Sequence, residues 1–240
     1  MSFIKLENIA KSYLYGEGEV HALRGVSFSI DKGEFVAIMG PSGSGKSTLL
    51  QILGFLDKPT SGKYFFEDKI SDSYSDDEIA RIRNEKMGFI FQAFNLLPRT
   101  TVAENVKLPL LYSKIKENEW NTLAQKAIEQ VGLTHRVNHE PSRLSGGEQQ
   151  RTAIARALIT NPEVIFADEP TGNLDSQSGH LVMETLQKLN EEQGRTIVLI
   201  THETHTAEHA QRIIKIFDGK IESDSIVKNR RKANDMELLK

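Results

Sequence analysis

A glycine-rich segment that directly follows a short apolar run limits the folds open to this chain. The run is Phe35–Met39, and the segment Gly40-Pro41-Ser42-Gly43-Ser44-Gly45-Lys46-Ser47 fits the phosphate-loop (P-loop) pattern G-x-x-x-x-G-K-[ST]. Its glycines let backbone N–H groups wrap a polyphosphate, and the dipole of the following helix adds positive charge. The pattern predicts that Lys46 holds the β and γ phosphates and that Ser47 is a Mg²⁺ ligand. A glycine turn that matches by chance is the alternative, and the strand-like run before it argues against that interpretation.

Two more short apolar runs predict a parallel sheet that is buried on both faces. Val164–Ala167 and Thr196–Ile200 are, like the first run, too short for a buried helix and rich in branched or aromatic side chains. Polar or glycine-rich residues follow each run. Since ligands of open α/β sheets bind beyond the carboxyl ends of the strands, we expect these polar segments to meet at one edge.

The other parts of the chain predict an antiparallel β region and a helical insertion. Phe3–Ile9 and Val26–Ile30 alternate apolar and polar residues, and a glycine-containing turn at Tyr15–Glu19 separates them. From about residue 93 to residue 161, apolar residues recur at helical spacing, which predicts a mostly helical subdomain. We expect Trp120 and the cluster Leu108–Tyr112 to pack in its core.

Composition narrows the class of protein. The 240 residues are 38% hydrophobic and 26% charged, which fits one compact domain, and we place that domain at residues 1–224. A formal net charge of -3 gives no broad positive field, so nucleic acid is not expected as a partner. The absence of cysteine excludes a disulfide framework and is compatible with a cytoplasmic location. No apolar run approaches the roughly 20 residues of a membrane-spanning helix, so we expect any membrane role to need a partner protein.

The C-terminal residues 225–240 are interpreted as a tail. Lys228–Lys232 is basic, and a short helical pattern, Asp235–Leu239, follows it. We expect the basic run to be solvated, as charged chain ends usually are.

Two adjacent carboxylates end the second apolar run. Asp168 and Glu169 follow directly on it, so one strand tip carries both to the edge predicted for the P-loop. We assign Mg²⁺ binding to Asp168 and the orientation and deprotonation of the attacking water, as general base, to Glu169. An acidic pair at a strand end is more often a helix cap or a solvated turn. The upstream P-loop favours the catalytic interpretation.

The segment Leu144–Arg151 predicts a second anion site. Ser145 can cap the helical pattern Ala153–Leu158, and Gly146 and Gly147 let a phosphate approach the start of that helix. An ordinary glycine-containing helix entry is the alternative.

A histidine follows the third apolar run. His202 in Thr201-His202-Glu203 is placed to hydrogen-bond a γ phosphate or the attacking water. A metal site formed with His205 and His209 is the alternative, but the spacing H-E-x-x-H is absent there.

Taken in order, these segments closely resemble the motif set of ABC ATPases. The matching positions are Gly40–Ser47, Gln92, Leu144–Gln149, Val164–Glu169, Asn173–Asp175 and His202. The resemblance implies a P-loop NTPase core with an antiparallel β subdomain and an inserted helical subdomain. It also implies that Glu169, His202 and Lys46 are catalytic and that Ser47, Gln92 and Asp168 surround Mg²⁺. The expected ATP contacts are Tyr13, Gly40, Pro41, Ser42, Gly43, Ser44, Gly45, Lys46, Ser47, Thr48, Gln92, Ser145, Gly146, Gly147, Glu148 and Asp175.

Within that set, the resemblance gives several residues individual roles. Tyr13 would stack on adenine, Gln92 would sense Mg²⁺ and the γ phosphate, Asp175 would couple the two sites, and His202 would be the switch histidine. Glu148 stands where glutamine is frequent in the family, a minor departure.

The family geometry also implies a dimer. The Ser145–Gly147 segment would lie too far from its own P-loop, so two copies are expected to face head to tail around two Mg-ATP molecules. Hydrolysis would remove the charge that holds the copies together and part them.

Finer features are similar to one group within the family. Ser71–Lys86, Phe94–Pro98 and Pro170–Ser176 look like their counterparts in the lipoprotein-release, macrolide-export and antimicrobial-peptide-resistance group. This implies a permease partner and a place at the cytoplasmic face of the membrane. In some of that group the ATPase is fused to its permease, and because it stands alone in this sequence, we expect the permease to be encoded separately. Phe94, Leu96 and Leu97 are expected either to line a groove for a permease helix or to pack in the core.

Other classes of function stay open to different degrees. A cell-division-type signalling ATPase would use the same motor on a permease-like partner. An ABC ATPase acting on DNA or ribosomes would usually bring long heptad arms or a second ATPase half, and neither is present in this sequence. A GTPase switch or a small-molecule kinase would not need the Leu144–Gln149 segment.

Overall fold

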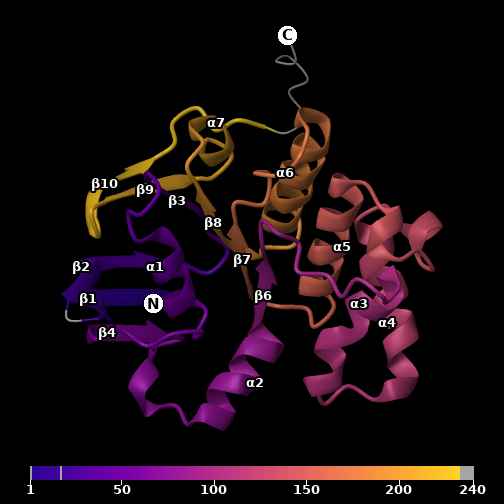
Figure 1. Ribbon diagram of the computed structural model, residues 1–240, viewed down its shortest axis with the longest axis horizontal. Coiled ribbons are helices and arrows are strands. Elements are labelled where there is room, and N and C mark those ends of the chain that lie inside the picture. Colours follow the sequence, from indigo (N-terminus) through magenta and orange to yellow (C-terminus); the bar gives the residue numbers. More distant parts are fainter. Residues whose placement is uncertain (1, 17, 233–240) are drawn as a thin grey trace.

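The computed structural model describes residues 2–16 and 18–232. Within these residues the larger β-sheet has six strands, and predicted site residues follow the C-terminal ends of several of them (Figure 1). The strand order is β10-β9-β3-β8-β7-β6. All neighbouring strands run parallel except β10, which pairs antiparallel with β9. The strands are β3 (Phe35–Met39), β6 (Met87–Ile90), β7 (Val164–Asp168), β8 (Thr196–Thr201), β9 (Arg212–Phe217) and β10 (Lys220–Ile226).

This sheet is buried on both faces, as its apolar runs predict. Along β3, Phe35 and Ala37 belong to one hydrophobic cluster, whereas Val36 and Ile38 belong to another on the opposite face. Because successive side chains of a strand point to opposite faces, a continuous apolar run is what a doubly covered strand needs.

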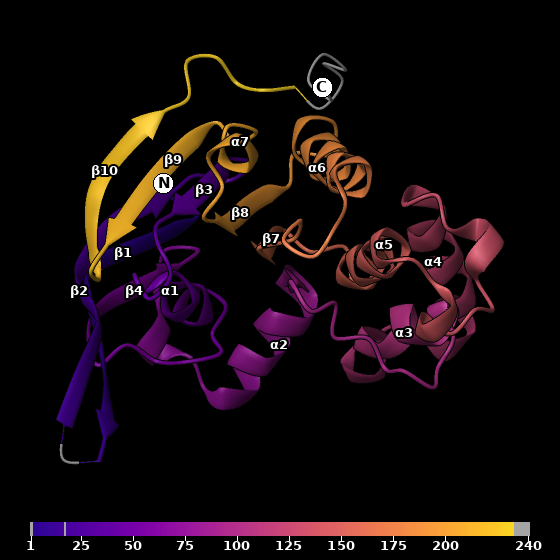
Figure 2. The same ribbon diagram turned by 45° about the horizontal axis from the view of Figure 1, so that its top comes forward.

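The smaller sheet is antiparallel, and its buried side chains share a hydrophobic cluster with one face of the larger sheet. Its order is β2-β1-β4-β5, with β1 (Ile4–Tyr15), β2 (Gly18–Ile30), β4 (Ser61–Phe66) and β5 (Lys69–Ile70). Both N-terminal strands are longer than the sequence predicts, because β1 and β2 stay paired as far as Tyr15 and Gly18. Their paired ends extend away from the body of the molecule as a two-stranded ribbon (Figure 2).

The helices divide between the core and a subdomain at one side of the molecule (Figure 1). α1 (Lys46–Leu53), α2 (Asp76–Lys86), α6 (Ser176–Glu191) and α7 (Thr204–Ala207) lie near the two sheets. α3 (Val102–Lys107), α4 (Glu117–Gln130) and α5 (Gly146–Leu158) form the helical insertion, joined by short 3₁₀ turns at Leu108–Tyr112, Thr134–Arg136 and Pro141–Arg143.

The core of the insertion differs in part from the prediction. Trp120 packs against the hydrophobic cluster and donates its indole N–H to the carbonyl of Ile115 at 3.0 Å. In Leu108–Tyr112, however, Leu110 is fully buried while Leu111 and Tyr112 are 59% and 83% exposed. The expectation that this whole cluster packs inside is therefore wrong. With about three residues per turn, only one side of the 3₁₀ turn faces the core.

The chain end is held against the body. β10 continues to Ile226, past residue 224 where the sequence analysis ends the domain. Arg230 donates to the carbonyl of His209 at 2.6 Å and pairs with Glu191 at 2.6 Å. Arg231 N donates to the carbonyl of Glu208 at 2.9 Å. The segment up to Arg231 is thus docked on α6 and α7, so the expectation that the basic run is solvated is wrong for Arg230 and Arg231. The pattern at 235–239 lies outside the described residues.

None of the helices within residues 2–16 and 18–232 combines the length and the apolar composition that a membrane-spanning helix requires.

Two neighbouring leucines test the packing of the insertion. We expect Leu110→Ala to lower the free energy of unfolding by about 2–5 kcal/mol, because it removes a fully buried side chain and leaves a cavity. Leu111→Ala, its control, should change that free energy by less than about 0.5 kcal/mol. Urea denaturation of both variants measures the difference, and equal losses would contradict the assignment of the inward face.

Candidate functional site

The P-loop connects the end of β3 to the start of α1. Lys46 folds back over the loop, and its ammonium donates to the carbonyls of Gly40 and Pro41 at 2.8 and 2.9 Å. Gly45, at the N-cap of α1, has φ 100° and makes no side-chain capping bond. No side chain therefore caps the start of α1, which suits a helix end that receives an anion.

Close backbone packing explains two of the glycines. A Cβ on Gly45 would lie 2.4 Å from the carbonyl oxygen of Ala22, and one on Gly40 would lie 2.2 Å from the carbonyl oxygen of Ile216. The Ser44 hydroxyl is buried and has no hydrogen-bond partner among the described residues. The loop is thus held between β2 and β9, and no larger residue fits at either glycine without moving the backbone.

The ends of β7 and β8 bring the predicted catalytic pair together. Asp168 lies opposite Ile200 in the parallel register, so Glu169 and His202 follow neighbouring strands. The two side chains meet with His202 Nδ1 at 2.9 Å from Glu169 Oε1. Glu169 has φ 43°, a left-handed conformation that is uncommon outside glycine and clusters at functional positions. The sequence predicts both residues, and the structure places them in contact.

Charges at this edge perturb one another. Burial lowers the pKa of Lys46, although Glu169 and Asp168 nearby act in the opposite direction. Burial and the charge of Glu169 raise the pKa of Asp168, and Lys46 partly offsets that rise. Two carboxylates at one strand tip share the positive charge of one lysine. Oxygen ligands with excess negative charge are what Mg²⁺ prefers, so these residues fit a hard divalent cation.

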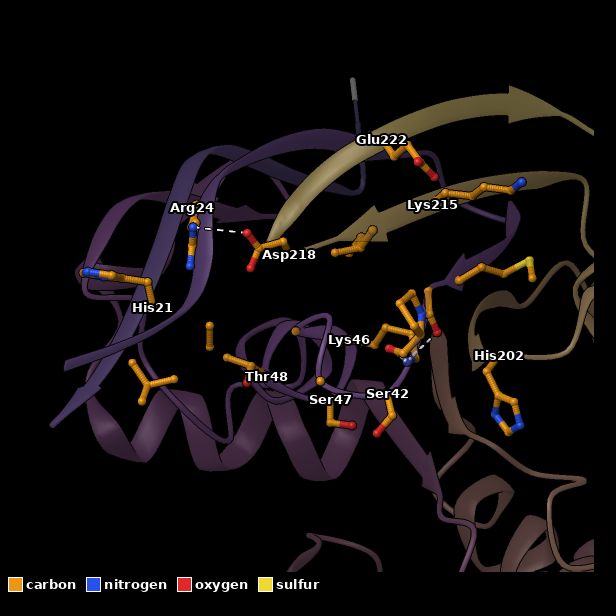
Figure 3. Close-up of a pocket in the computed structure, with 18 of the residues that line it drawn as sticks. His21, Arg24, Ser42, Lys46, Ser47, Thr48, His202, Lys215, Asp218 and Glu222 are labelled. Carbon is orange, nitrogen blue, oxygen red and sulfur yellow. Dashed lines mark hydrogen bonds and ion pairs between the residues drawn. The ribbon is translucent and has the colours of Figure 1, made fainter. Parts of the chain in front are cut away.

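A cavity of about 1170 Å³ surrounds the P-loop (Figure 3). Its volume exceeds the range of roughly 300–1,000 Å³ typical of small-molecule sites, so a nucleoside triphosphate fits. The predicted residues that line it are Gly40, Pro41, Ser42, Gly43, Gly45, Lys46, Ser47, Thr48, Gln92, Glu169 and His202.

Gln92 reaches this cavity from the segment after β6. Its side-chain amide lies 3.4 Å from Asn173 Oδ1, and Asn173 Nδ2 donates to the Gln92 carbonyl at 3.0 Å. A Cβ on Gly172 would lie 2.7 Å from the Gln92 amide. Gln92 is therefore packed against the segment that leads to Asp175.

The second predicted anion site lies at the start of α5 and does not line the cavity. Ser145 and Glu148 form a capping box, in which Ser145 N donates to Glu148 Oε2 at 2.8 Å and Glu148 N donates to Ser145 Oγ at 3.3 Å. Glu148 also pairs with Arg136 at 2.8 Å. Ser178 packs directly against Gly147, and a Cβ at this position would lie 2.5 Å from the Ser178 hydroxyl. A larger residue would therefore displace Ser178.

Asp175 connects to that site within the same chain. It is the N-cap of α6, and its carboxylate accepts from Ser178 N at 2.9 Å and from the Ser178 hydroxyl at 2.8 Å. These hydrogen bonds lower the pKa of Asp175. Since Ser178 also packs against Gly147, the position of the α5 start depends on the α6 start.

Tyr13 also stands outside the cavity wall. It lies in β1, is 37% exposed, and its hydroxyl donates to Asp57 Oδ2 at 2.9 Å. Phe94 and Leu96 are half-buried, whereas Leu97 is 45% exposed.

Part of the cavity wall escaped sequence analysis. It comes from β2 and from the β9–β10 hairpin, where Arg24 and Asp218 form an ion pair at 3.2 Å (Figure 3). Charged residues in strands carry no spacing signal, so no motif points to them. What identifies this part of the wall is the contact between Ala22 and Gly45, which can be seen only in the folded structure.

The alternative metal site is not supported. His209 is buried and its Nδ1 faces the carbonyls of His205 and Thr206 at 3.1 and 3.3 Å. Among the residues described, no group of three or more histidine, cysteine, aspartate or glutamate side chains is arranged to hold a metal ion.

Comparisons with known proteins agree with the motif order. The profile of the ABC transporter family matches residues 23–172. A protein of Methanocaldococcus jannaschii, Uncharacterized ABC transporter ATP-binding protein MJ0796, is 48% identical over 92% of this chain and 96% of its own length. The Macrolide export ATP-binding/permease protein MacB of Syntrophobacter fumaroxidans is 50% identical over 94% of this chain. The chain spans only 32% of that exporter.

A solved structure gives the same fold. The dimeric post-hydrolysis state of the ATP-binding cassette MJ0796, bound to ADP and Pi, superposes with a TM-score of 0.86 at 46% identity. The match covers 94% of this chain and 99% of that one. It confirms the α/β P-loop fold predicted from the sequence. The chain therefore belongs to the ABC transporter family, as an ATP-binding cassette with ATPase activity.

Proposed function

We propose that the chain is a motor subunit that dimerises around two Mg-ATP molecules and drives a separate permease at the cytoplasmic face of a membrane. The observation that carries this proposal is the separation of the two anion sites. Ser145, Gly146 and Gly147 do not line the cavity that holds the P-loop, and a second copy would bring them to it. The dimers formed by the related cassette MJ0796 support this arrangement.

The phosphates would be held mainly by the backbone of the P-loop. Its amides and the uncapped start of α1 provide donors, and Lys46 exchanges its bonds to Gly40 and Pro41 for the β and γ phosphates. Tyr13 would take the adenine ring by stacking. The exported or extracted cargo would be a macrolide, a peptide or a lipoprotein, as the name of the MacB relative and the sequence features of that group suggest.

The Mg²⁺ ligands would be Ser47, Gln92 and Asp168. Bound there, Mg²⁺ neutralises charge that develops on the phosphate oxygens. Glu169 accepts a proton from the attacking water, and His202, which contacts Glu169 at 2.9 Å, holds the carboxylate and the γ phosphate in place. Asp175 would report the state of one site to the other through Ser178 and Gly147.

Removing the general base tests the hydrolytic assignment. We expect Glu169→Gln to slow ATP turnover by about 10²- to 10⁴-fold, because the amide cannot take the proton of water. The variant should also accumulate an ATP-bound dimer in size-exclusion chromatography. Glu184→Gln, a glutamate of α6 paired with Lys188, is the matched control and should leave both readouts unchanged. Turnover at the unmodified rate in Glu169→Gln would refute the assignment.

Replacing Asp168, a proposed Mg²⁺ ligand, should change the stability of the protein in a way that depends on pH. Burial and Glu169 raise the folded-state pKa of Asp168 above its ordinary 3.8, so ionised Asp168 destabilises the fold when no metal is bound. This destabilisation is absent below the ordinary value and appears as pH rises through the raised pKa. Without nucleotide and metal, Asp168→Asn should therefore raise the melting temperature at neutral pH while Mg-dependent hydrolysis falls.

That gain should shrink as the pH is lowered toward 3.8. Asp31→Asn, at an exposed aspartate in the turn after β2, is the control and should change the melting temperature little at any pH. A lower melting temperature for Asp168→Asn, or a gain that is the same at every pH, would contradict the proposed charge arrangement.

The proposed permease contact is tested at Leu97. Its side chain is exposed, whereas its backbone is fixed by Asn105: Leu97 N donates to Asn105 Oδ1 at 2.8 Å. We expect Leu97→Asp to reduce co-purification of the membrane subunit by about tenfold or more, because a carboxylate would be buried without a partner. Leu181→Asp, at a leucine of α6 that is 39% exposed, is the control. If Leu97→Asp still captured the subunit fully, the groove assignment would be withdrawn.

A further inference from the structure

Three side chains near the start of the protruding β1–β2 ribbon form a connected cluster that the phosphate site does not explain. Lys11 Nζ donates to Asp57 Oδ1 at 2.6 Å, and the Tyr13 hydroxyl donates to Asp57 Oδ2 at 2.9 Å. Lys11 also donates to the carbonyl of Lys58 at 2.7 Å and lies over the Tyr13 ring, 4.9 Å from its centroid. The phenol is thus held at its hydroxyl and covered on one face.

The contacts with Lys11 and Asp57 are needed to fix the Tyr13 ring, because Tyr13 lies beyond the part of β1 that pairs with β4. β1 pairs with β4 as far as Ala10, which lies opposite Ser61, and Ser12 N donates to Thr60 Oγ1 at 3.0 Å. Tyr13 itself pairs with Val20 of β2, in the ribbon that extends from the body (Figure 2). An isolated two-stranded ribbon is only marginally stable in water. The bonds to Asp57 therefore connect Tyr13 to the body of the domain.

The contacts within the cluster favour the charged form of Asp57. The Lys11 and Asp57 side chains are 12% and 28% exposed, so water screens their pair less than it screens a surface pair. Asp57 Oδ1 accepts a further bond from Lys58 N at 2.7 Å. Burial acts to raise the pKa of Asp57, but the bonds from Lys11, Tyr13 and Lys58 hold it below the usual value.

The cluster also adjoins the phosphate site. Asp57 lies four residues beyond α1, the helix that begins at Lys46. Burial and the bond to Asp57 raise the pKa of Tyr13, while a hydrogen bond with Thr48 lowers it. Thr48 lines the cavity around the P-loop. Tyr13 is thus held beside the first turn of the helix that would carry the phosphates.

We propose that Lys11 and Asp57 are positioning residues that fix the Tyr13 ring so that its one open face receives the adenine base. The inference rests on the proposed stacking role of Tyr13. Because Lys11 covers one face, a base has a single place to stack. Because Asp57 holds the hydroxyl, the ring is ordered before the nucleotide arrives, so less conformational freedom is lost on binding.

The first test compares two lysines of the same strand. We expect Lys11→Met to raise KM for ATP about three- to tenfold with kcat changed by less than about twofold, the size of a lost partly buried ion pair and cation–π contact. Lys11→Arg should keep KM near the unmodified value. Lys5→Met is the matched control, because Lys5 pairs with Glu7 at 2.6 Å and lies 5.7 Å from the Phe65 ring centroid.

A ligand without a base separates positioning from general damage. Inorganic tripolyphosphate occupies the phosphate site alone, so its inhibition constant against ATP hydrolysis should be the same for Lys11→Met and for the unmodified chain. A parallel rise of that constant and of KM would overturn the proposal, since it would show a damaged P-loop. An unchanged KM in Lys11→Met would overturn it equally.

A double-mutant cycle distinguishes failure of this inference from failure of the stacking role. With Tyr13→Ala as background, Lys11→Met should raise KM no further, because there is no ring left to position. If Tyr13→Ala raises KM and Lys11→Met raises it again by the full factor, the positioning role is wrong and stacking stands. If Tyr13→Ala leaves KM unchanged, the stacking role itself is wrong and the inference falls with it.

Discussion

The backbone contacts that hold the P-loop are the constraint on which the rest of the site depends. Gly45 lies against the carbonyl of Ala22 in β2, and Gly40 lies against the carbonyl of Ile216 in β9. Gly219 completes the connection, since its N–H donates to the Ser44 carbonyl at 3.1 Å and its carbonyl accepts from Arg24 N at 2.8 Å. Two segments far apart in the sequence, β2 and the β9–β10 hairpin, thus fix one loop. A phosphate cradle made of main-chain amides needs such support, because it has few side chains to order it.

Strand register then delivers the charged groups to that loop. Asp168, Glu169 and His202 follow β7 and β8, which pair in parallel beside β3, so their side chains arrive at the edge where the P-loop begins. Two of these residues adopt energetically unfavourable states. The left-handed backbone of Glu169 and the raised pKa of Asp168 are two signs of this. Sites shaped for a bound ligand commonly give up stability in its absence.

Much of this arrangement could be predicted from the sequence because it depends on local spacing. The P-loop, the carboxylates after β7 and the histidine after β8 each follow an apolar run, and parallel strands bring such positions together. The wall formed by Arg24 and Asp218 could not be predicted, because its residues meet only when β2 crosses the β9–β10 hairpin. The exposure of Leu111 was missed for a related reason. Composition shows that a segment is apolar, but the neighbouring elements decide which side of it is covered.

The docked chain end has a mechanical consequence. Arg230 joins Glu191, at the end of α6, to the carbonyl of His209, just beyond α7. α6 begins next to Asp175, and α7 begins two residues after His202. The last described residues therefore connect the two helices that follow Asp175 and His202. Moving one of these helices without the other would break the contacts that Arg230 makes with both segments, so the chain end links their positions.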